Sequence, residues 1–378
     1  MNQKLVLIGG GHSHAIALRQ WGLNPLPGID LTLISDVEQT PYSGMLPGHV
    51  AGFYSYDQTH IDLSSLAQFA GAKLIVDRAT NLNTDHNHVI CKSGNKIEFD
   101  YLSIDIGSTP ETITVPGTKE YAIPAKPVPD FLNAWYKLKQ SAVCNPEQPR
   151  TIAIVGGGAG GVELALNMQA CLRAILNGKS TPEIHLIHRG KQLLSGHNDW
   201  VSKKLTKIIQ QRGIKLHLQQ DVIEVLQEQI ICQSGLKIAA TNIFWLTQAA
   251  APSWIAESNL ATNELGFILV ANTLQSISHP HIFAAGDIAT MINYQRPKAG
   301  VFAVRQGQPL FNNWQNILTQ QPLQNYIPQD KYLALIGTGD FKAIASSGSL
   351  GWRSTFFWWL KDYIDRQFMN QFVNLNTR

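Results

Sequence analysis

Leu5-Val6-Leu7-Ile8-Gly9-Gly10-Gly11-His12-Ser13-His14 is an apolar run that passes directly into a glycine-rich turn. Four consecutive apolar residues are typical of a strand buried in a parallel sheet, and the following Ala15-Ile16-Ala17-Leu18 indicates a helix. In a GxGxxG turn of this kind, Gly9 makes the tight turn and Gly11 lets the backbone approach a pyrophosphate at the helix N-terminus. The third position should be small but is His14, whose ring must either hold the helix away from the strand or insert between them.

The same pattern recurs 147 residues later. The run Thr151–Val155 predicts a second buried strand, and Gly156, Gly158 and Gly161 fill all three glycine positions. An amphipathic helix over 163–176 and an apolar strand over 183–187 complete the unit. Because strand, turn, helix and strand follow one another in this order, the segment predicts a dinucleotide-binding unit and strengthens the first match.

The residues that end this second unit bear on the choice of nucleotide. NAD sites place a carboxylate there for the ribose hydroxyls, whereas a 2′-phosphate requires cations. The chain has His188-Arg189-Gly190-Lys191 and no acid. Because arginine suits a phosphate, the sequence favours NADPH over NADH. The alternative is a solvated basic turn without a role in nucleotide binding.

In the first unit, Asp36 follows the apolar strand Ile29–Ser35. It is either the ribose-binding acid of that unit or an exposed acid in a turn. The next segment, residues 40–48, is too rich in proline and glycine for a strand or a long helix. We expect this loop to lie over a bound cofactor.

Length and composition limit the class of protein. The 378 residues allow two or three domains, and only 15% of them are charged, against about 25% in typical soluble domains. A formal net charge of +3 without a Lys/Arg run does not indicate nucleic-acid binding. The first strand begins at about Lys4 and no apolar run is long enough to cross a membrane, so we expect neither a signal peptide nor a spanning helix. The cysteines form no CxxC pair and are expected to be reduced thiols of a cytoplasmic protein: Cys91, Cys144, Cys171 and Cys232.

Two more segments have the form of a buried strand with a polar end. One covers residues 101–106 and ends at Gly107, and the other is Phe283-Ala284-Ala285-Gly286-Asp287. A carboxylate at the mouth of such a strand can accept hydrogen bonds from a polyol chain.

With these motifs the chain resembles the flavoproteins with two dinucleotide-binding domains that are related to pyridine nucleotide-disulfide reductases and type II NAD(P)H dehydrogenases. The two glycine turns, the strand leading to Gly107 and the segment ending at Asp287 carry the resemblance over nearly the whole chain. Residues 9–14, together with Thr40-Pro41-Tyr42-Ser43-Gly44-Met45-Leu46-Pro47-Gly48, are most similar to the flavoprotein domain found alone or fused to selenophosphate synthetase.

The resemblance implies an α/β fold with two Rossmann-like dinucleotide-binding domains, the second inserted in the first. Residues 1–118 and 264–322 are then the FAD-binding domain, and residues 119–263 bind NADPH or NADH. Residues 323–378 form a C-terminal α+β region on the side of the electron acceptor.

Motifs and resemblance together predict the cofactor sites. FAD is expected at Gly9, Gly11, His12, Ser13, His14, Asp36, Pro41, Tyr42, Ser43, Gly107, Gly286, Asp287, Val301 and Phe302. NAD(P)H is expected at Gly156, Gly158, Gly161, Glu163, His188, Arg189 and Lys191. Because the flavin carries the chemistry, no side-chain catalyst is required. Glu163, Lys298 and Tyr42 are nevertheless candidates beside the reacting rings, with Ser43 and Arg305 in the same pocket.

Departures from the family pattern exclude some of the reactions that the family catalyses. Residues 41–46 contain no cysteine, which excludes a dithiol relay over the flavin there, and none follows Cys232, as the thiol chemistry of sulfide:quinone reductases would require. Type II dehydrogenases have a glutamine-rich quinone-contacting segment, of which only Gln306 remains in the corresponding residues 298–307. The predicted acceptor is therefore quinone-like or another small molecule. A helix starting near Gly300 would point its positive end at the flavin.

Residues 355–372 predict one amphipathic helix with Phe357, Leu360, Ile364, Phe368 and Phe372 along a stripe. Type II dehydrogenases sit on membranes through a C-terminal helical region, so peripheral contact with the cytoplasmic face of a membrane is one reading. The charges on the polar face balance, however, and this favours packing or homodimerisation through the helix.

A metal site is not expected. His12 and His14 are two ligands without a third nearby, which favours packing or contact with phosphate at the helix start.

The sequence thus predicts an FAD-dependent NAD(P)H dehydrogenase that passes hydride from NADPH or NADH to flavin, and electrons onward to a quinone-like acceptor. Two alternatives remain: a non-catalytic FAD/NADPH redox sensor, and an electron donor to a protein partner in selenium metabolism.

Overall fold

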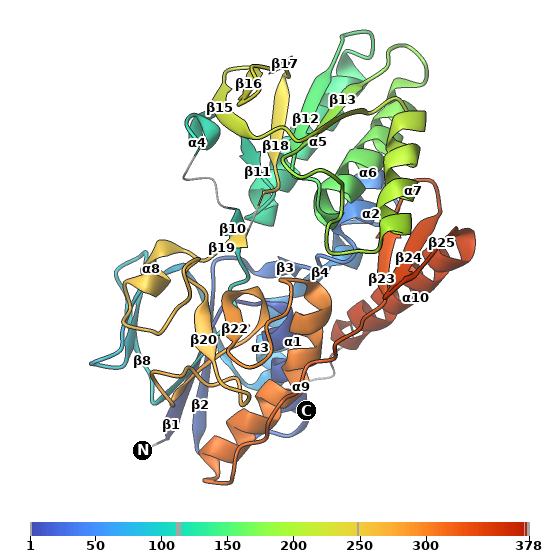
Figure 1. Cartoon of the computed structure of the whole chain (residues 1–378). Helices are drawn as coiled ribbons and strands as arrows, with labels where there is room; N and C mark the ends of the chain where they lie inside the picture. Colours follow the sequence, from blue (N-terminus) through green and yellow to red (C-terminus); the bar gives the residue numbers. More distant parts are fainter. Residues whose placement is uncertain (1, 111–114, 248, 374, 376–378) are drawn as a thin grey trace.

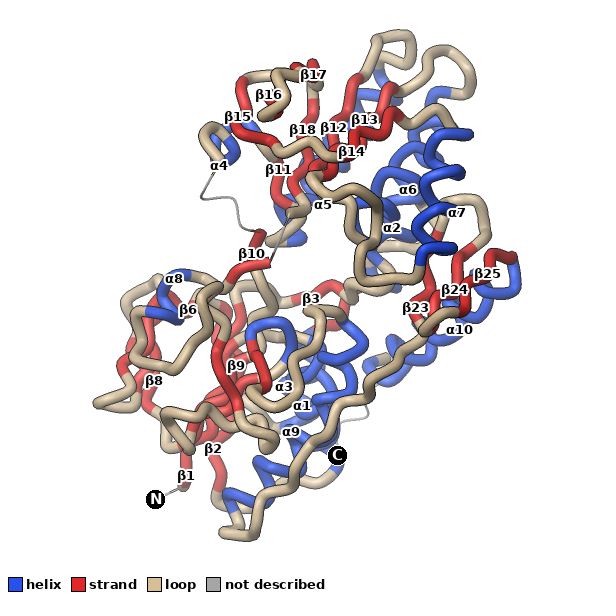
Figure 2. The backbone as a smooth tube through the Cα atoms, in the orientation of Figure 1, coloured by secondary structure: helices blue, strands red, loops and turns tan. Residues whose placement is uncertain are grey.

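The computed structural model describes residues 2–110, 115–247, 249–373 and 375. Figure 1 shows two lobes, with the N-terminus in the lower one and β12, β13 and β18 in the upper one. Helices and strands alternate through both lobes (Figure 2). The predicted mixed α/β fold with parallel sheets is confirmed.

The lower lobe contains a parallel sheet in the order β21-β9-β1-β2-β5. Its strands are β1 (Gln3–Ile8), β2 (Ile29–Ser35), β5 (Lys73–Val76), β9 (Tyr101–Ile104) and β21 (Ile282–Ala284). The apolar run of β1 lies at the centre, where Leu7 pairs with Leu33 of β2 and with Ser103 of β9. The helices of this lobe are α1 (His12–Leu23), α3 (Leu63–Ala70) and α9 (Gly300–Leu318). The predicted helix at Gly300 is therefore present.

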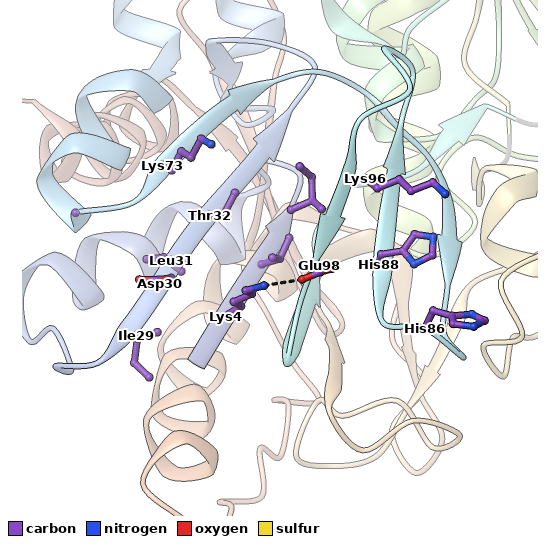
Figure 3. Close-up of a pocket in the computed structure, with 13 residues that line it drawn as sticks. Lys4, Ile29, Asp30, Leu31, Thr32, Lys73, His86, His88, Lys96 and Glu98 are labelled. Atoms are coloured by element: carbon purple, nitrogen blue, oxygen red, sulfur yellow. Dashed lines mark hydrogen bonds and ion pairs between the residues drawn. The ribbon is translucent and has the colours of Figure 1, made fainter. Parts of the chain in front are cut away.

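An antiparallel meander faces this sheet across a groove. It consists of β6 (Ala79–Asn83), β7 (His88–Cys91) and β8 (Lys96–Glu98). Figure 3 shows Lys4 and Glu98 facing each other across the groove. The amine of Lys4 donates to Glu98 at 2.7 Å. The groove adjoins Lys4 and Ile29, where the parallel strands begin, whereas the glycine turn follows their other end.

The upper lobe repeats the plan with a parallel sheet in the order β11-β18-β12-β13-β14. Its strands are β11 (Ile123–Pro124), β12 (Thr151–Val155), β13 (Glu183–His188), β14 (Lys215–Leu218) and β18 (Asn242–Trp245). The helices are α5 (Val128–Cys144), α6 (Ala159–Leu176) and α7 (Asp199–Gln211). A second meander is formed by β15 (Val222–Leu226), β16 (Gln229–Cys232) and β17 (Lys237–Ala239).

The chain leaves the lower sheet after β9 and returns to it with β21, so the second sheet is inserted within the first. The two crossing segments pair as β10 (Thr109–Pro110) and β19 (Ala249–Ala250). The boundaries of the three predicted domains stay a prediction. The remaining short elements are β3 (Gln39–Pro41), α2 (Leu46–Ala51), η1 (Asp57–Thr59), β4 (His60–Asp62), α4 (Thr118–Tyr121), α8 (Ser253–Ala256), β20 (Ile268–Val270), η2 (Gly286–Ile288) and β22 (Ala289–Met291).

The C-terminal region joins the two lobes. It comprises β23 (Ala334–Gly337), β24 (Ala343–Ser347), β25 (Leu350–Ser354), α10 (Thr355–Met369) and η3 (Asn370–Phe372). Ile336 and Ile344 pack into the core of the upper lobe, whereas Phe368 and Phe372 pack into the core of the lower one.

Helix α10 differs from the prediction in the faces that it buries. Phe368 and Phe372 are buried as expected, but Ile364 is exposed and the charged pair Lys361 and Asp365 points inward. The reason is that this pair finds hydrogen-bond partners inside the protein: Lys361 donates to the carbonyl of Gly44, and Asp365 accepts from Tyr42. Three aromatic residues of the helix, Phe356, Trp359 and Tyr363, are consequently exposed.

Candidate functional site

The first glycine turn connects β1 to α1. Gly9 has a φ of +91°, and a Cβ there would lie 2.3 Å from the carbonyl oxygen of Asp105. Only glycine satisfies both constraints, because other residues avoid this φ and would collide with the strand end. Gly11 then forms the N-cap of α1. The predicted strand–turn–helix is confirmed.

Asp105, which follows β9, fills the space beneath this turn. Its Oδ2 accepts hydrogen bonds from the backbone N–H groups of Ser13 at 2.9 Å and His14 at 3.1 Å. Burial raises the pKa of this carboxyl to about 7, and the charge of Asp287 contributes in the same direction. Sequence reasoning missed Asp105. An acid directly after the buried run Tyr101–Ile104 was the available signal.

His14 inserts its imidazole between helix and sheet. Nδ1 lies 2.7 Å from the carbonyl oxygen of Gly9 and Nε2 lies 2.8 Å from the hydroxyl of Ser103. Because a carbonyl only accepts, Nδ1 carries the proton, and Nε2 accepts from Ser103. Burial lowers the pKa of His14 to about 4, so the ring is neutral. This resolves the anomaly of the third motif position in favour of insertion.

The neighbours of His14 also form contacts at the helix start. The hydroxyl of Ser13 donates to the carbonyl of Ala303 in α9 at 2.7 Å. Nε2 of His12 accepts from the backbone N–H of Ser43 at 3.4 Å, and its ring meets Tyr42 edge-on at 5.3 Å. Burial lowers the pKa of His12 to about 4. Residues 42 and 43 of the loop thus lie against the first turn, and the expectation that residues 40–48 cover a bound cofactor stays a prediction.

The segment ending at Asp287 lies in the region of the first turn, although it is far from that turn in the sequence. The carboxylate of Asp287 accepts from the amine of Lys126 at 3.1 Å and from Ser108 at 3.4 Å. Gly107 has a φ of +68°, and the nearest atom to a Cβ there is the Lys126 amine, 3.9 Å away. The polar groups at this strand end therefore border open space.

The start of α9 lies on the opposite side of the region around the first turn. Val301 is half-buried and Phe302 buried, and a Cβ at Gly300 would approach the Ser43 hydroxyl to 3.2 Å. Gln306, the remaining glutamine of the segment that contacts quinone in type II dehydrogenases, accepts from the Gly286 N–H at 2.6 Å.

Lys298 is held by the carbonyl of Ala289 at 2.5 Å and the hydroxyl of Thr290 at 2.8 Å. Its amine also lies 4.1 Å from the centre of the Phe267 ring. Burial lowers the pKa of Lys298 to about 8.

Asp36 lies at the end of β2, the position expected for a ribose-binding acid. It forms an exposed ion pair with Arg78, whose Nη2 lies 3.0 Å from Oδ2. Both readings of Asp36 stay open, since an exposed pair of this kind holds little energy and can yield to a ligand.

The second turn repeats the geometry with glycine at all three positions. A Cβ would lie 2.3 Å from the Leu246 carbonyl at Gly156, and 1.9 Å from the Gly156 carbonyl at Gly161. At Gly158, the N-cap of α6, a Cβ would meet nothing within 4 Å, and no side chain caps the helix. The start of α6 thus offers its amides to open space, which suits an anion.

The end of β13 carries the three predicted basic residues. Nδ1 of His188 accepts from the backbone N–H of Gly157 at 3.2 Å, which fixes its ring beside the turn. Arg189 and Lys191 form no ion pair within the described residues, and both are exposed. Two cations without an acid therefore lie at the position that distinguishes the two nucleotides.

Glu163 of α6 is part of a buried polar cluster that sequence reasoning did not find. Its Oε1 accepts from the backbone N–H of Gly337 at 2.7 Å, and burial raises its pKa to about 7. The amine of Lys361 in α10 lowers that pKa and donates to Asp365 and to the carbonyl of Gly44, each at 2.6 Å. The cluster joins the second turn to the loop beside the first.

Tyr42 belongs to this cluster too, because its hydroxyl donates to Asp365 at 3.1 Å. Its ring stacks on Phe368 at 4.4 Å. Burial and the Asp365 charge raise the pKa of Tyr42, so the phenol stays protonated. Tyr42 therefore ties the predicted flavin loop to α10.

The residues fit two dinucleotides. Open backbone at Gly107 with Asp287 and Lys126 suits the polar chain of FAD, and the uncapped start of α6 at Gly158 suits the diphosphate of NAD(P)H. Such a protein is an oxidoreductase with two dinucleotide-binding units. The chain belongs to the pyridine nucleotide-disulphide oxidoreductase family, whose model matches residues 3–307. FAD and NAD(P)H are its cofactors.

The chain is also similar to several named proteins. The NADH dehydrogenase-like protein YutJ of Bacillus subtilis is 23% identical over 90% of this chain and 91% of its own length. The type II NADH:quinone oxidoreductase of Haemophilus influenzae is 25% identical over 66% of this chain and 63% of its own. The solved structure of NDH2 from Plasmodium falciparum in complex with NADH has a TM-score of 0.83 at 17% identity, covering 99% of this chain and 98% of that one.

The cysteines do not form the disulfide of the family name. Cys91, Cys171 and Cys232 are buried and Cys144 is exposed, and all four are free thiols. Among the helices in the described residues, none has the length and hydropathy of a transmembrane span.

Proposed function

We propose that the chain is an NAD(P)H dehydrogenase that takes hydride from NADPH and delivers electrons to a quinone-like acceptor without a redox-active disulfide. The observation that carries the proposal is the contact between the units. Glu163, two residues past the second glycine turn, lines the same pocket as Gly44 beside the first turn, and Lys361, which lines it too, donates to the carbonyl of Gly44. When bound, FAD supplies the hydride acceptor and the electron relay.

The residues of the chain serve binding and orientation in this proposal. The loop at Tyr42 and the start of α9 at Gly300 enclose the flavin, and Asp287 binds its ribityl chain. The half-buried Glu163, with a pKa near neutrality, can hold a proton beside the site. We keep Lys298 as a candidate for the same pocket.

NADPH is proposed as the donor because Arg189 and Lys191 are exposed cations without a competing carboxylate. Arginine forms bidentate bonds with phosphate, and the absence of an acid from the sequence at 188–191 removes the usual ribose partner of NADH.

A quinone-like acceptor is proposed because relatives named as quinone reductases share the family and much of the chain. An apolar acceptor also agrees with the outer surface of the C-terminal region. Trp352, Phe356, Trp359 and Tyr363 are each more than 60% exposed there. We propose that this aromatic surface contacts a membrane, since such side chains favour the interface between water and lipid.

The proposal is tested by anaerobic mixing of the yellow protein with NADPH and, separately, NADH. Loss of the flavin absorbance band is expected with both and faster with NADPH, and a soluble quinone should then restore the band. A flavin that neither nucleotide bleaches would contradict the dehydrogenase function. Bleaching without reoxidation by quinone would favour the redox-sensor alternative.

The link to selenium metabolism stays a prediction from the residues of the two N-terminal motifs. Co-purification with a selenophosphate synthetase is the measurement that would support it.

A further inference from the structure

The two glycine turns differ at one equivalent position. A Cβ at Gly9 would meet the carbonyl oxygen of Asp105 at 2.3 Å, and a Cβ at Gly156 would meet that of Leu246 at the same distance. Asp105 and Leu246 therefore occupy corresponding places after the neighbouring parallel strand. One turn has a carboxylate where the other has an apolar side chain.

The Asp105 carboxylate lies in the centre of the first turn. A Cβ at Gly11 or at Gly286 would come within 2.3 Å of its Oδ1. Its Oδ2 uses the backbone N–H groups of Ser13 and His14, two of the first amides of α1. In the second turn, the corresponding space at Gly158 is open. The first turn therefore contains an anion of its own.

A bound diphosphate competes with this anion. Both seek the positive end of α1 and its free amides. Two like charges a few ångströms apart in a buried site repel each other strongly. A carboxyl group relieves such repulsion by taking up a proton, and the neutral form can donate a hydrogen bond to a phosphate oxygen.

The surrounding groups offer Asp105 little positive charge. His12 and His14 of α1 are neutral, since burial lowers the pKa of each to about 4. Asp287 adds negative charge, and the nearby cation Lys126 is paired with Asp287. Burial already raises the pKa of Asp105 to about 7 without a ligand.

We propose that Asp105 is a positioning residue of the FAD site that holds the α1 amides in place in the free protein and takes up one proton when the FAD diphosphate binds. Affinity for FAD then falls as the pH rises above neutrality. The proposal rests on the assignment of FAD to the first turn.

The test is a titration of the full-length apoprotein with FAD, followed by quenching of flavin fluorescence, from about pH 6 to about pH 9. The Kd of the wild type should rise by up to about tenfold per pH unit above pH 7, as linkage to one proton requires. Asp105→Asn should bind FAD with a Kd that changes little over this range. Asp287→Asn is the comparison variant: it should weaken binding at every pH and keep the slope, but the rise in Kd should begin at a lower pH, because the Asp287 charge raises the pKa of Asp105.

Calorimetry in buffers of different ionisation enthalpy gives a second readout. Up to one proton should be taken up per FAD bound at about pH 8. Riboflavin, which lacks the diphosphate, should take up none. This comparison uses the wild type alone and decides the question if Asp105→Asn does not fold.

An equal pH slope in Asp105→Asn, or FAD binding without proton uptake, would overturn the role of Asp105. Failure of the proposed function looks different. In that case the apoprotein binds no FAD at any pH, or the reconstituted flavin is not reduced by NADPH.

Discussion

The imidazole of His14 forms a hydrogen bond to the sheet that glycine, which has no side chain, could not form. In the second turn, a side chain at Gly161 would collide with the Gly156 carbonyl at 1.9 Å. In the first turn, the corresponding carbonyl of Gly9 accepts a hydrogen bond from His14 instead, and Ser103 completes the arrangement. The first turn therefore leaves room for a side chain at this position, whereas the second turn does not.

Replacing His14 with alanine should destabilise the protein by about 2–4 kcal/mol, because the change opens a cavity and leaves the Ser103 hydroxyl without its partner. Urea unfolding measures this. Ser103→Ala is the control and should cost about 1 kcal/mol, since it removes a single hydrogen bond. Equal costs for the two variants would show that the ring of His14 contributes nothing to stability beyond its hydrogen bond to Ser103.

Arg189→Glu should lower the ratio of kcat/KM for NADPH to that for NADH by at least about tenfold, because a charge-assisted bond to the 2′-phosphate becomes a repulsion. Steady-state kinetics with both nucleotides measure the ratio. Lys137→Glu, a change of the same charge at an exposed residue of α5, should leave it unchanged. An unchanged ratio in Arg189→Glu would contradict the assignment of this turn to the 2′-phosphate.

Among single residues, the sequence predicted those whose role depends on a local pattern. Gly9 and Gly156 were recognisable because each follows an apolar strand and precedes a helix. Asp105 was not, since 92 residues separate it from the amide of Ser13 that it binds. The contact exists only after β9 has paired with β1.

Helix α10 turns one charged pair inward and three of its aromatic rings outward. The half-buried Lys361 and the buried Asp365 face the loop at Gly44, while Phe356, Trp359 and Tyr363 are exposed. Leu350 and Trp352 of the adjacent hairpin extend the same surface. Isolated exposed apolar residues are ordinary, but five aromatic and aliphatic side chains in one region indicate a contact surface.

The double variant Phe356→Ser and Trp359→Ser should bind anionic lipid vesicles at least about tenfold more weakly than the wild type, because burial of two aromatic rings is lost. Vesicle co-sedimentation measures the binding. Ile327→Ser removes an apolar side chain that is 67% exposed elsewhere and serves as the control. The homodimer would be favoured instead if the wild type does not bind vesicles but forms a dimer, and if the double variant loses this dimer.

Lys361→Met should cost about 3–5 kcal/mol of stability, because Asp365 would stay buried without its cation. Arg366→Met, on the same helix, removes an ion pair to Asp362 in which the arginine side chain is 43% exposed. This change should cost at most about 1 kcal/mol of stability. Denaturant unfolding compares the two variants. Similar costs would show that the inward charges do not anchor α10.

The sequence predicted α10 as an element but not its orientation. Periodicity identifies a helix with two faces, and burial of the apolar face is the usual outcome. Here the acceptors for Lys361 come from the loop at Gly44, and Tyr42 donates to Asp365 from the same loop. No pattern within residues 355–372 contains that information.

Across the whole molecule, buried groups respond to acid in opposite directions. The folded-state pKa of His14 lies near 4, below its ordinary 6.5, so the unfolded chain binds more protons and acid destabilises the fold. The folded-state pKa of Glu163 lies near 7, above its ordinary 4.5, so acid stabilises the fold through this group. Both effects fall between about pH 4 and about pH 7.

Urea unfolding between about pH 4.5 and about pH 6.5 separates the two effects. His14→Ala should flatten the loss of stability on acidification, and Glu163→Gln should steepen it, each by up to about 1.4 kcal/mol per pH unit. A shift of the two variants in the same direction would contradict the assigned protonation states.

The arrangement of the two sheets was largely predictable because both glycine turns, the strand leading to Gly107 and the segment ending at Asp287 have local signals. The joining of the lobes was not. It depends on pairs such as Lys126 with Asp287 and Tyr42 with Asp365, which come from distant segments and no common motif.

The place of β21 in the first sheet also determines when that sheet can be completed on the ribosome. Strands β1, β2, β5 and β9 all lie within the first 104 residues, but β21 begins at residue 282 and α9 at residue 300. At a synthesis rate of about 5–20 residues per second, β9 leaves the ribosome roughly 10–35 s before its second neighbour exists. During translation its exposed edge is available to chaperones or to other chains, and the FAD site cannot close until most of the protein has been made.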